Sequence, residues 1–187
     1  MAAETMGLQN LFLDGLKDIY YAENKILKAL PTMIEGAYTE EVTAAFEKHQ
    51  TETEGQVERL NEVFEMLGES PRGKECPAID GILAEGEEIL EEYEATPAVD
   101  AGLVAAAQAV EHYEIARYGT LVAWASVLGM TDAAQLLQAT LDEEVATDEA
   151  LTELAEGGVN EAALEEEGDD ESADDAEDPD TLEPTGL

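Results

Sequence analysis

Residues 110–121 read VEHYEIARYGTL, and Glu114 within this stretch restricts the possible folds more than any other residue. Successive residues of an α-helix are rotated by about 100°, so Glu114 falls near the centre of the apolar face that contains Val110 and Leu121. Burying an ionised carboxylate in an apolar core is costly unless a positive charge lies beside it. The stretch therefore predicts a core helix whose carboxylate meets either a bound cation or a buried basic side chain.

Three other helical segments also place an acidic or imidazole side chain on or beside their apolar stripe. Glu23 lies beside Ile19 and Ile26, His49 lies inside the stripe of its segment, and Glu144 lies near the centre of the last one. A helical bundle that turns such groups inward from every long helix typically holds metal. The chain is so acidic that some carboxylates fall inward by chance, so their joint occurrence on four helices is better evidence than any single residue.

Further candidates lie about one helical turn away from these residues. Glu111 lies on the edge of the face of Glu114, Glu52 lies on the margin of the stripe of His49, and Asp148 follows Glu144 by one turn. His112 points to solvent by the same count. The candidate metal ligands are therefore Glu23, His49, Glu52, Glu111, Glu114, Glu144 and Asp148.

The donor types in this set favour a pair of iron or manganese ions. In the usual dinuclear pattern two helices each supply one Glu and the other two each supply Glu-x-x-His. The match here is partial, because Phe46 stands three residues before His49 and Thr147 stands three residues after Glu144. A set rich in oxygen and poor in nitrogen favours iron or manganese over copper or zinc.

Each candidate also has a structural interpretation without metal. Glu114 could pair with Arg117, which lies one turn later on the same face. His49 could be a hydrogen-bonded core histidine, and Glu23 and Glu52 could lie on solvated helix edges. The aromatic residues near these positions are interpreted as packing residues with a polar tip. They are Tyr20, Tyr21, Tyr113, Tyr118 and Trp124.

Helical periodicity extends over most of the chain. Apolar residues recur at three- and four-residue steps in five segments, which we expect to form helices. A kink is expected at Pro31, Thr39 is expected to start the second helix, and Gly129 is expected to close the fourth. The expected helices are residues 8–38, 39–67, 77–93, 96–129 and 131–154. No segment alternates apolar and polar residues for long enough to form a strand, so the fold class is all-α.

The spacing of the helices predicts a particular bundle. Two long helices joined by a tight turn are followed by about 30 residues with one short helix, and then by two more long helices joined tightly. The long connection allows the second and third long helices to run parallel, as in ferritin-like folds. We therefore expect a ferritin-like four-helix bundle with one long crossover that carries a short fifth helix.

The composition changes at Glu156. The segment from there onward is strongly acidic, has no basic residue and contains little aliphatic material. Such a segment buries too little apolar surface to offset the entropy of ordering it. The predicted organisation is a helical bundle over residues 1–155 and a disordered acidic tail over residues 156–187.

The charge balance excludes some partners and indicates an environment. The 187 residues include 46 Asp and Glu but only 8 Lys and Arg, for a formal net charge of −38. Nucleic acids and anionic membranes are recognised through basic side chains, so neither is an expected partner. Because a chain so charged repels itself at low salt, we expect a salt-rich cytoplasm as its setting.

Cysteine usage and hydropathy also indicate the cytoplasm. Cys76 is the only cysteine, so no internal disulfide can form. The first residues lack the basic and apolar regions of a signal peptide, and no apolar run reaches the roughly 20 residues that span a bilayer.

Several blocks of the sequence resemble a known family. LQNLFLDGLKDIYYAENKILKALPTM at 8–33, VEHYEIARYGTL at 110–121 and LDEEVATDE at 141–149 are similar to the YciE/YciF group of ferritin-like stress proteins. The resemblance covers nearly everything between residues 8 and 155. It implies a ferritin-like bundle, association into homodimers and a link to stress responses. It implies no settled activity.

The resemblance also implies metal positions, namely Glu23, His49 or Glu52, Glu111 or Glu114, and Glu144 with Asp148. The leading hypothesis is a cytoplasmic protein with a dinuclear iron or manganese site that acts on peroxide in oxidative or general stress, with catalase-like or peroxidase-like activity left open. The alternative is a metal-free dimeric scaffold of the same fold. Iron storage, a third hypothesis, requires a closed shell of many subunits.

Overall fold

The computed structural model describes residues 7–169, and every element in this range is helical. The elements are α1 (Leu8–Gly36), α2 (Glu40–Met66), α3 (Pro77–Glu92), α4 (Pro97–Val127), α5 (Thr131–Leu154), a π-helical turn (Ala155–Val159) and α6 (Asn160–Asp169). The predicted all-α class is confirmed, and so is the order of four long helices with one short helix in the crossover. None of the helices in the described range is long and apolar enough to cross a membrane.

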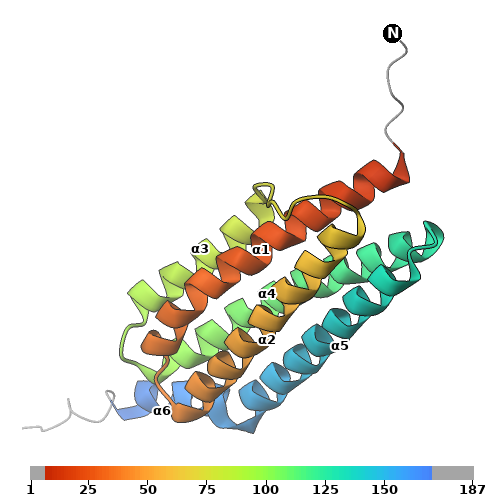
Figure 1. Cartoon of the computed structure of the whole chain (residues 1–187). Coiled ribbons are helices and arrows are strands. Elements are labelled where there is room, and N and C mark those ends of the chain that lie inside the picture. Colours follow the sequence, from red (N-terminus) through yellow and green to blue (C-terminus); the bar gives the residue numbers. More distant parts are fainter. Residues whose placement is uncertain (1–6, 170–187) are drawn as a thin grey trace, which may run out of the picture.

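The four long helices lie side by side as two hairpins (Figure 1). α1 and α2 form one hairpin, α4 and α5 form the other, and α3 packs on α1 and α4 from outside the bundle. α2 and α4 run parallel, because the crossover returns the chain to the end at which α2 begins. Asp100 in the first turn of α4 fixes this arrangement, since its carboxylate accepts hydrogen bonds from the backbone N–H groups of Tyr38 and Thr39 at 2.7 and 2.9 Å.

The helix ends follow the local chemistry of the sequence. The hydroxyl of Thr39 accepts a hydrogen bond from the backbone N–H of Val42, as expected of an N-cap. Gly129 adopts φ of 72° after α4, a left-handed conformation that glycine adopts without steric strain. α1 continues through Pro31 to Gly36, close to the expected end.

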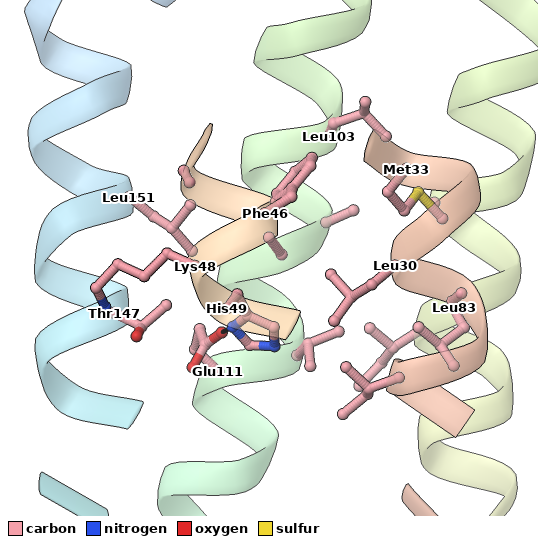
Figure 2. Close-up of a pocket in the computed structure, with 18 of the residues that line it drawn as sticks. Leu30, Met33, Phe46, Lys48, His49, Leu83, Leu103, Glu111, Thr147 and Leu151 are labelled. Carbon is pink, nitrogen blue, oxygen red and sulfur yellow. Dashed lines mark ion pairs between the residues drawn. The ribbon is translucent and has the colours of Figure 1, made fainter. Parts of the chain in front are cut away.

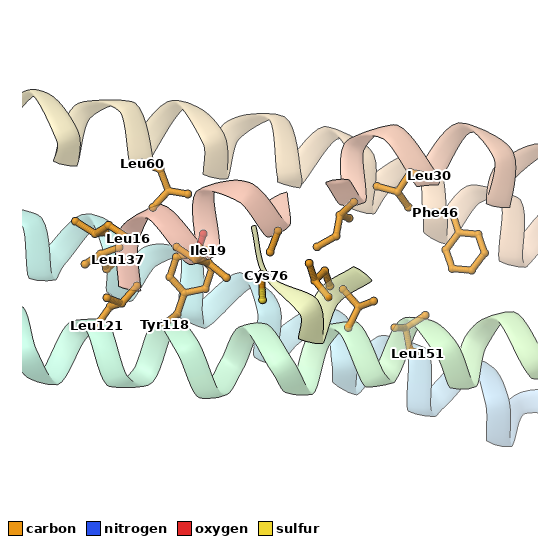
Figure 3. Packing of buried hydrophobic residues seen from close by; sticks show 14 of the residues in the cluster. Leu16, Ile19, Leu30, Phe46, Leu60, Cys76, Tyr118, Leu121, Leu137 and Leu151 are labelled. Atoms are coloured by element: carbon orange, nitrogen blue, oxygen red, sulfur yellow. The ribbon is translucent and has the colours of Figure 1, made fainter. Parts of the chain in front are cut away.

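The buried apolar residues form layers on either side of a polar middle. One layer contains Leu16, Leu121 and Leu137, and the other contains Phe46 and Leu151 (Figure 3). Along α1, α4 and α5, the buried residues Glu23, Glu111, Glu114 and Glu144 stand between these layers in the sequence. The fold therefore carries its candidate site in the middle of the bundle.

The chain stays helical beyond the predicted boundary at residue 155. The π-helical turn, in which Gly158 has φ of 142°, leads into α6, and α6 packs against α4. This differs from the expectation of a disordered tail from Glu156. The physical reason is that half-buried Leu154, Ala155 and Val159 extend the apolar contact past the last predicted helix. The rest of the expected tail, residues 170–187, lies outside the described residues.

Candidate metal centre

Five of the candidate ligands converge inside the bundle from four different helices. His49, Glu111 and Glu114 form one group, and Glu23, Glu114 and Glu144 form a second. Within each group the potential ligand atoms lie within 4.8 Å of one another. Glu114 belongs to both groups, so its carboxylate stands where a ligand that bridges two ions would stand.

These carboxylates are buried and mostly without partners. Glu23, Glu111, Glu114 and Glu144 are at most 1% exposed. Neither oxygen of Glu111 or Glu114 has a hydrogen-bond partner, and Glu23 and Glu144 each keep one unpartnered oxygen. Buried polar atoms are nearly always hydrogen-bonded, so such a concentration of exceptions indicates a missing positive partner.

Arg117 is not that partner. Its Nε lies 3.4 Å from the Oδ2 of Asp18, and its guanidinium lies over the ring of Tyr113, 5.2 Å from the centroid. The side chain is 49% exposed. The alternative of a buried ion pair between Glu114 and Arg117 is therefore wrong. The cause is that Asp18 of the neighbouring α1 offers Arg117 a carboxylate without removing its charge from solvent.

His49 supplies the single imidazole of the centre. Its Nδ1 lies 2.9 Å from the Oε1 of Glu111, without the alignment of a good hydrogen bond. Burial lowers the pKa of His49, although the charges of Glu144 and Glu23 oppose this shift. A neutral imidazole is the form that binds metal.

The buried carboxyl groups hold their protons strongly when no cation is present. Burial raises the pKa of Glu111 to about 7. Burial also raises the pKa values of Glu23, Glu114 and Glu144 well above the usual range, and nearby carboxylates raise each of them further. A bound cation would reverse this preference, because it stabilises the ionised form.

Tyr118 contacts the centre from a fully buried position. Its hydroxyl donates a hydrogen bond to the Oε1 of Glu23, which leaves the Oε2 of Glu23 unpartnered. Burial raises the pKa of Tyr118 well above its usual value, and the charges of Glu23 and Glu114 raise it further, so the hydroxyl keeps its proton. The sequence placed Tyr118 only among packing residues.

The two remaining candidates lie at the margin of the centre. Glu52 pairs with Lys48 at 2.5 Å and accepts a hydrogen bond from the hydroxyl of Thr147 at 3.3 Å. Asp148 lies 3.2 Å from the Nε2 of His112, whose side chain is 69% exposed as expected. Neither acid belongs to the two buried groups of potential ligands.

Gln56 and Asp100 are among the buried polar residues outside the predicted set of ligands. Gln56 of α2 is 1% exposed and lies on the stripe of His49, and its Oε1 has no partner. Asp100 is equally buried, but it accepts hydrogen bonds at the start of α2 and is structural. Helical periodicity could have found Gln56, because the residue repeats at the same spacing as His49 and Thr53.

Comparison with known proteins identifies the family of the chain. Residues 7–164 match the model of a family described as "Domain of unknown function (DUF892)". The chain belongs to this family.

Two relatives of the DUF892 chain illustrate the match. Protein YciF of Escherichia coli (strain K12) is 42% identical over 154 residues, covering 82% of this chain and 93% of the relative. The crystal structure of the E. coli stress protein YciF matches with a TM-score of 0.79 and 41% identity, covering 83% of this chain and 99% of the other. A structure of YcfI from Rhodopseudomonas palustris matches with a TM-score of 0.76 and 47% identity, covering 81% and 97%.

The donor set of this DUF892 chain fits a pair of divalent ions. The two groups contain four carboxylates, whose combined charge equals and opposes that of two divalent cations. They contain one imidazole and no thiolate, which suits iron or manganese better than copper. The buried His and Glu groups could therefore hold metal.

Proposed function

We propose that this protein binds two iron or manganese ions in the middle of its bundle and acts on peroxide during oxidative or general stress. The observation that carries the proposal is the position of Glu114, whose oxygens have no protein partner and lie within reach of both ligand groups. The stress role is extended to this chain from E. coli YciF, which is described as a stress protein.

The residues of the chain would divide the work as follows. Glu114 would bridge the two ions, His49 and Glu111 would complete one ligand set, and Glu23 and Glu144 would complete the other. A pair of such ions would supply the redox chemistry, giving two electrons to one peroxide as its O–O bond is cleaved and recovering two from a second peroxide.

The metal site is tested by elemental analysis of protein purified without chelator from cells supplied with iron and manganese. We expect about two ions per chain in the wild type, in line with a paired site. Glu114→Gln removes the shared charge and should lose most of this metal. Glu149→Gln removes an exposed charge from α5 and serves as the matched control. Equal metal content in all three proteins would contradict the site and favour a metal-free structural role.

The remaining parts of the proposal concern assembly and environment. We propose that the chain forms a homodimer in a salt-rich cytoplasm. The exposed apolar side chains that could serve an interface include Leu11, Tyr38 and Val127. Light scattering at high salt checks the assembly, and a closed shell of many subunits would instead support iron storage.

A further inference from the structure

An apolar cavity of about 80 Å³ lies beside the candidate metal centre, toward the end of the bundle where α2 and α4 begin. All four long helices and α3 contribute to its walls (Figure 2). The walls are aliphatic or aromatic almost throughout. They include Ile26, Leu30, Met33, Phe46, Leu103 and Leu151.

The cavity has one polar end, where Lys48, His49, Glu111 and Thr147 lie (Figure 2), and the metal centre adjoins this end. His49 and Glu111, which line it, belong to one of the two ligand groups. Leu103 and Met33 lie at the opposite end (Figure 2). Along α4 the rise from Leu103 to Glu111 is about 12 Å at 1.5 Å per residue. A molecule in the cavity would therefore have its apolar part among Leu and Met side chains and its polar part at the ligands.

The size and the walls of the cavity select the occupant. A cavity of roughly 150 Å³ lined by Leu, Ile and Phe stays dry and binds benzene. Away from its polar end, this cavity likewise offers a water molecule no hydrogen-bond partners. At about 80 Å³ the cavity is smaller than that example and suits a compact alkyl group such as tert-butyl. Hydrogen peroxide has no apolar part, so the walls would give it no binding energy in exchange for its lost hydrogen bonds with water.

We propose that the cavity binds the alkyl group of a short-chain organic hydroperoxide and places the peroxide oxygens beside His49 and Glu111. The choice of a peroxide rests on the proposed function, and the choice of an alkyl group rests on the cavity. Both oxygens of Glu111 lack an aligned hydrogen-bond partner, although the Nδ1 of His49 lies 2.9 Å from Oε1, so an oxygen of its carboxyl group can accept the O–H of the hydroperoxide. The substrate class is thereby narrowed from peroxides in general to alkyl hydroperoxides.

The test uses the full chain freed of metal by chelator, so that alkyl binding is measured apart from metal binding. tert-Butyl hydroperoxide and its unreactive analogue tert-butanol are titrated while the methyl NMR signals of Leu30, Leu103 and Leu151 are followed. We expect both compounds to shift these signals in a saturable way and hydrogen peroxide to leave them unchanged.

Variants in which one alanine is replaced by leucine locate the binding site of the alkyl group. Ala107→Leu places extra atoms in the cavity from α4 and should weaken binding of tert-butanol at least tenfold, as is usual for small changes in an apolar pocket. Ala45→Leu does the same from α2, and is available should the first variant fold poorly. Ala101→Leu adds the same atoms at a half-buried position of α4 outside the cavity and should leave the affinity unchanged.

Two results would overturn the proposal. One is equal affinity for tert-butanol in the wild type and in both cavity variants. The other is binding of xenon without binding of tert-butanol, which would restrict the cavity to molecules the size of a gas. Because metal is absent throughout, neither result depends on whether Glu114→Gln loses metal. The experiments therefore test the proposal of alkyl binding in the cavity separately from the proposal of metal binding.

Discussion

Glu114 illustrates the conflict between stability and binding at the level of one residue. Its carboxyl group is fully buried, has no partner and lies near three other buried carboxyl groups. In metal-free protein desolvation and the neighbouring carboxyl groups both raise its pKa and so favour the protonated form. An apolar side chain of similar size would therefore stabilise the folded protein more than this carboxyl group does.

Glu114→Leu should therefore stabilise the metal-free protein while it abolishes metal binding. Replacing buried ionic groups by apolar side chains of similar volume commonly stabilises by about 1–4 kcal/mol. Urea unfolding with chelator present measures the change. Glu149→Leu, at an exposed position, should change the free energy of unfolding by less than about 0.5 kcal/mol. A strong destabilisation by Glu114→Leu would show that the carboxyl group has a structural partner.

Tyr118 acts on the centre through Glu23 and not by direct ligation. Its hydroxyl occupies one oxygen of Glu23 and so directs the other toward Glu114 and Glu144. Removing a hydrogen bond of this kind usually costs 10–100-fold in metal affinity, so we expect a loss of about that size in Tyr118→Phe. Titration with manganese or ferrous salt measures it.

The control for Tyr118→Phe is Tyr20→Phe. The ring of Tyr20 packs edge-on against Phe64 with centroids 5.5 Å apart, in contact with the same core. Loss of the Tyr20 hydroxyl should leave the metal affinity unchanged. If both variants bound metal as the wild type does, Tyr118 would be a packing residue only, which is how the sequence alone described it.

The residues of the centre differ in how far sequence could predict them. Glu114 and His49 lie on clear apolar stripes, so helical periodicity alone turns them inward. The bond between Tyr118 and Glu23 joins residues 95 positions apart and depends on how α4 packs on α1. No spacing rule carries that information, because it concerns the rotation of one helix against another.

At the level of whole elements, the start of α2 depends on a residue of another helix. Asp100 of α4 accepts hydrogen bonds from two backbone N–H groups and from the hydroxyl of Thr39. Asp100→Ala leaves these half-buried donors without their acceptor, and hydrogen bonds to charged groups contribute about 1.5–3 kcal/mol each. We expect a loss of about 2–4 kcal/mol in urea unfolding, since part of the loss is recovered by water.

Asp132→Ala is the matched control for this element. Asp132 also lies in the first turn of a helix, but it is exposed and contributes only through the helix dipole. Its removal should cost less than about 1 kcal/mol. If Asp100→Ala were equally mild, the junction of α2 and α4 would be held by the apolar contacts alone.

The helices themselves could be predicted well because their ends are marked by local chemistry. Gly68 and Gly129 each follow the end of a helix in a left-handed conformation, and Thr39 caps α2 locally through the N–H of Val42 in addition to its bonds with Asp100. α6 could not be predicted because its own segment is strongly acidic and because the residues that it contacts lie far away in the sequence. It continues from the π-helical turn at Ala155–Val159 and packs on α4, and a charge count could not show that contact.

At the level of the whole molecule, the buried carboxyl groups link folding to pH. The pKa of Glu111 is about 7 in the folded state and near 4.5 when unperturbed. Between these values the unfolded chain has released its proton while the folded chain retains it. Stability therefore falls as the pH rises through this window, and the loss is complete above about pH 7. For Glu111 alone the shift corresponds to about 3 kcal/mol, and its buried neighbours act in the same direction.

We therefore expect chelator-treated protein to be more stable at about pH 5 than at about pH 8. Urea unfolding across this range measures the trend, and Glu111→Gln should make it shallower because one of the titrating groups is gone. Bound manganese or iron should reverse the trend, because protons compete with metal for the same oxygens and metal affinity rises with pH. Stability that stays constant or rises with pH in the metal-free protein would mean that the carboxylates are neutralised by the protein itself. In that case the two ligand groups would have no need of a cation.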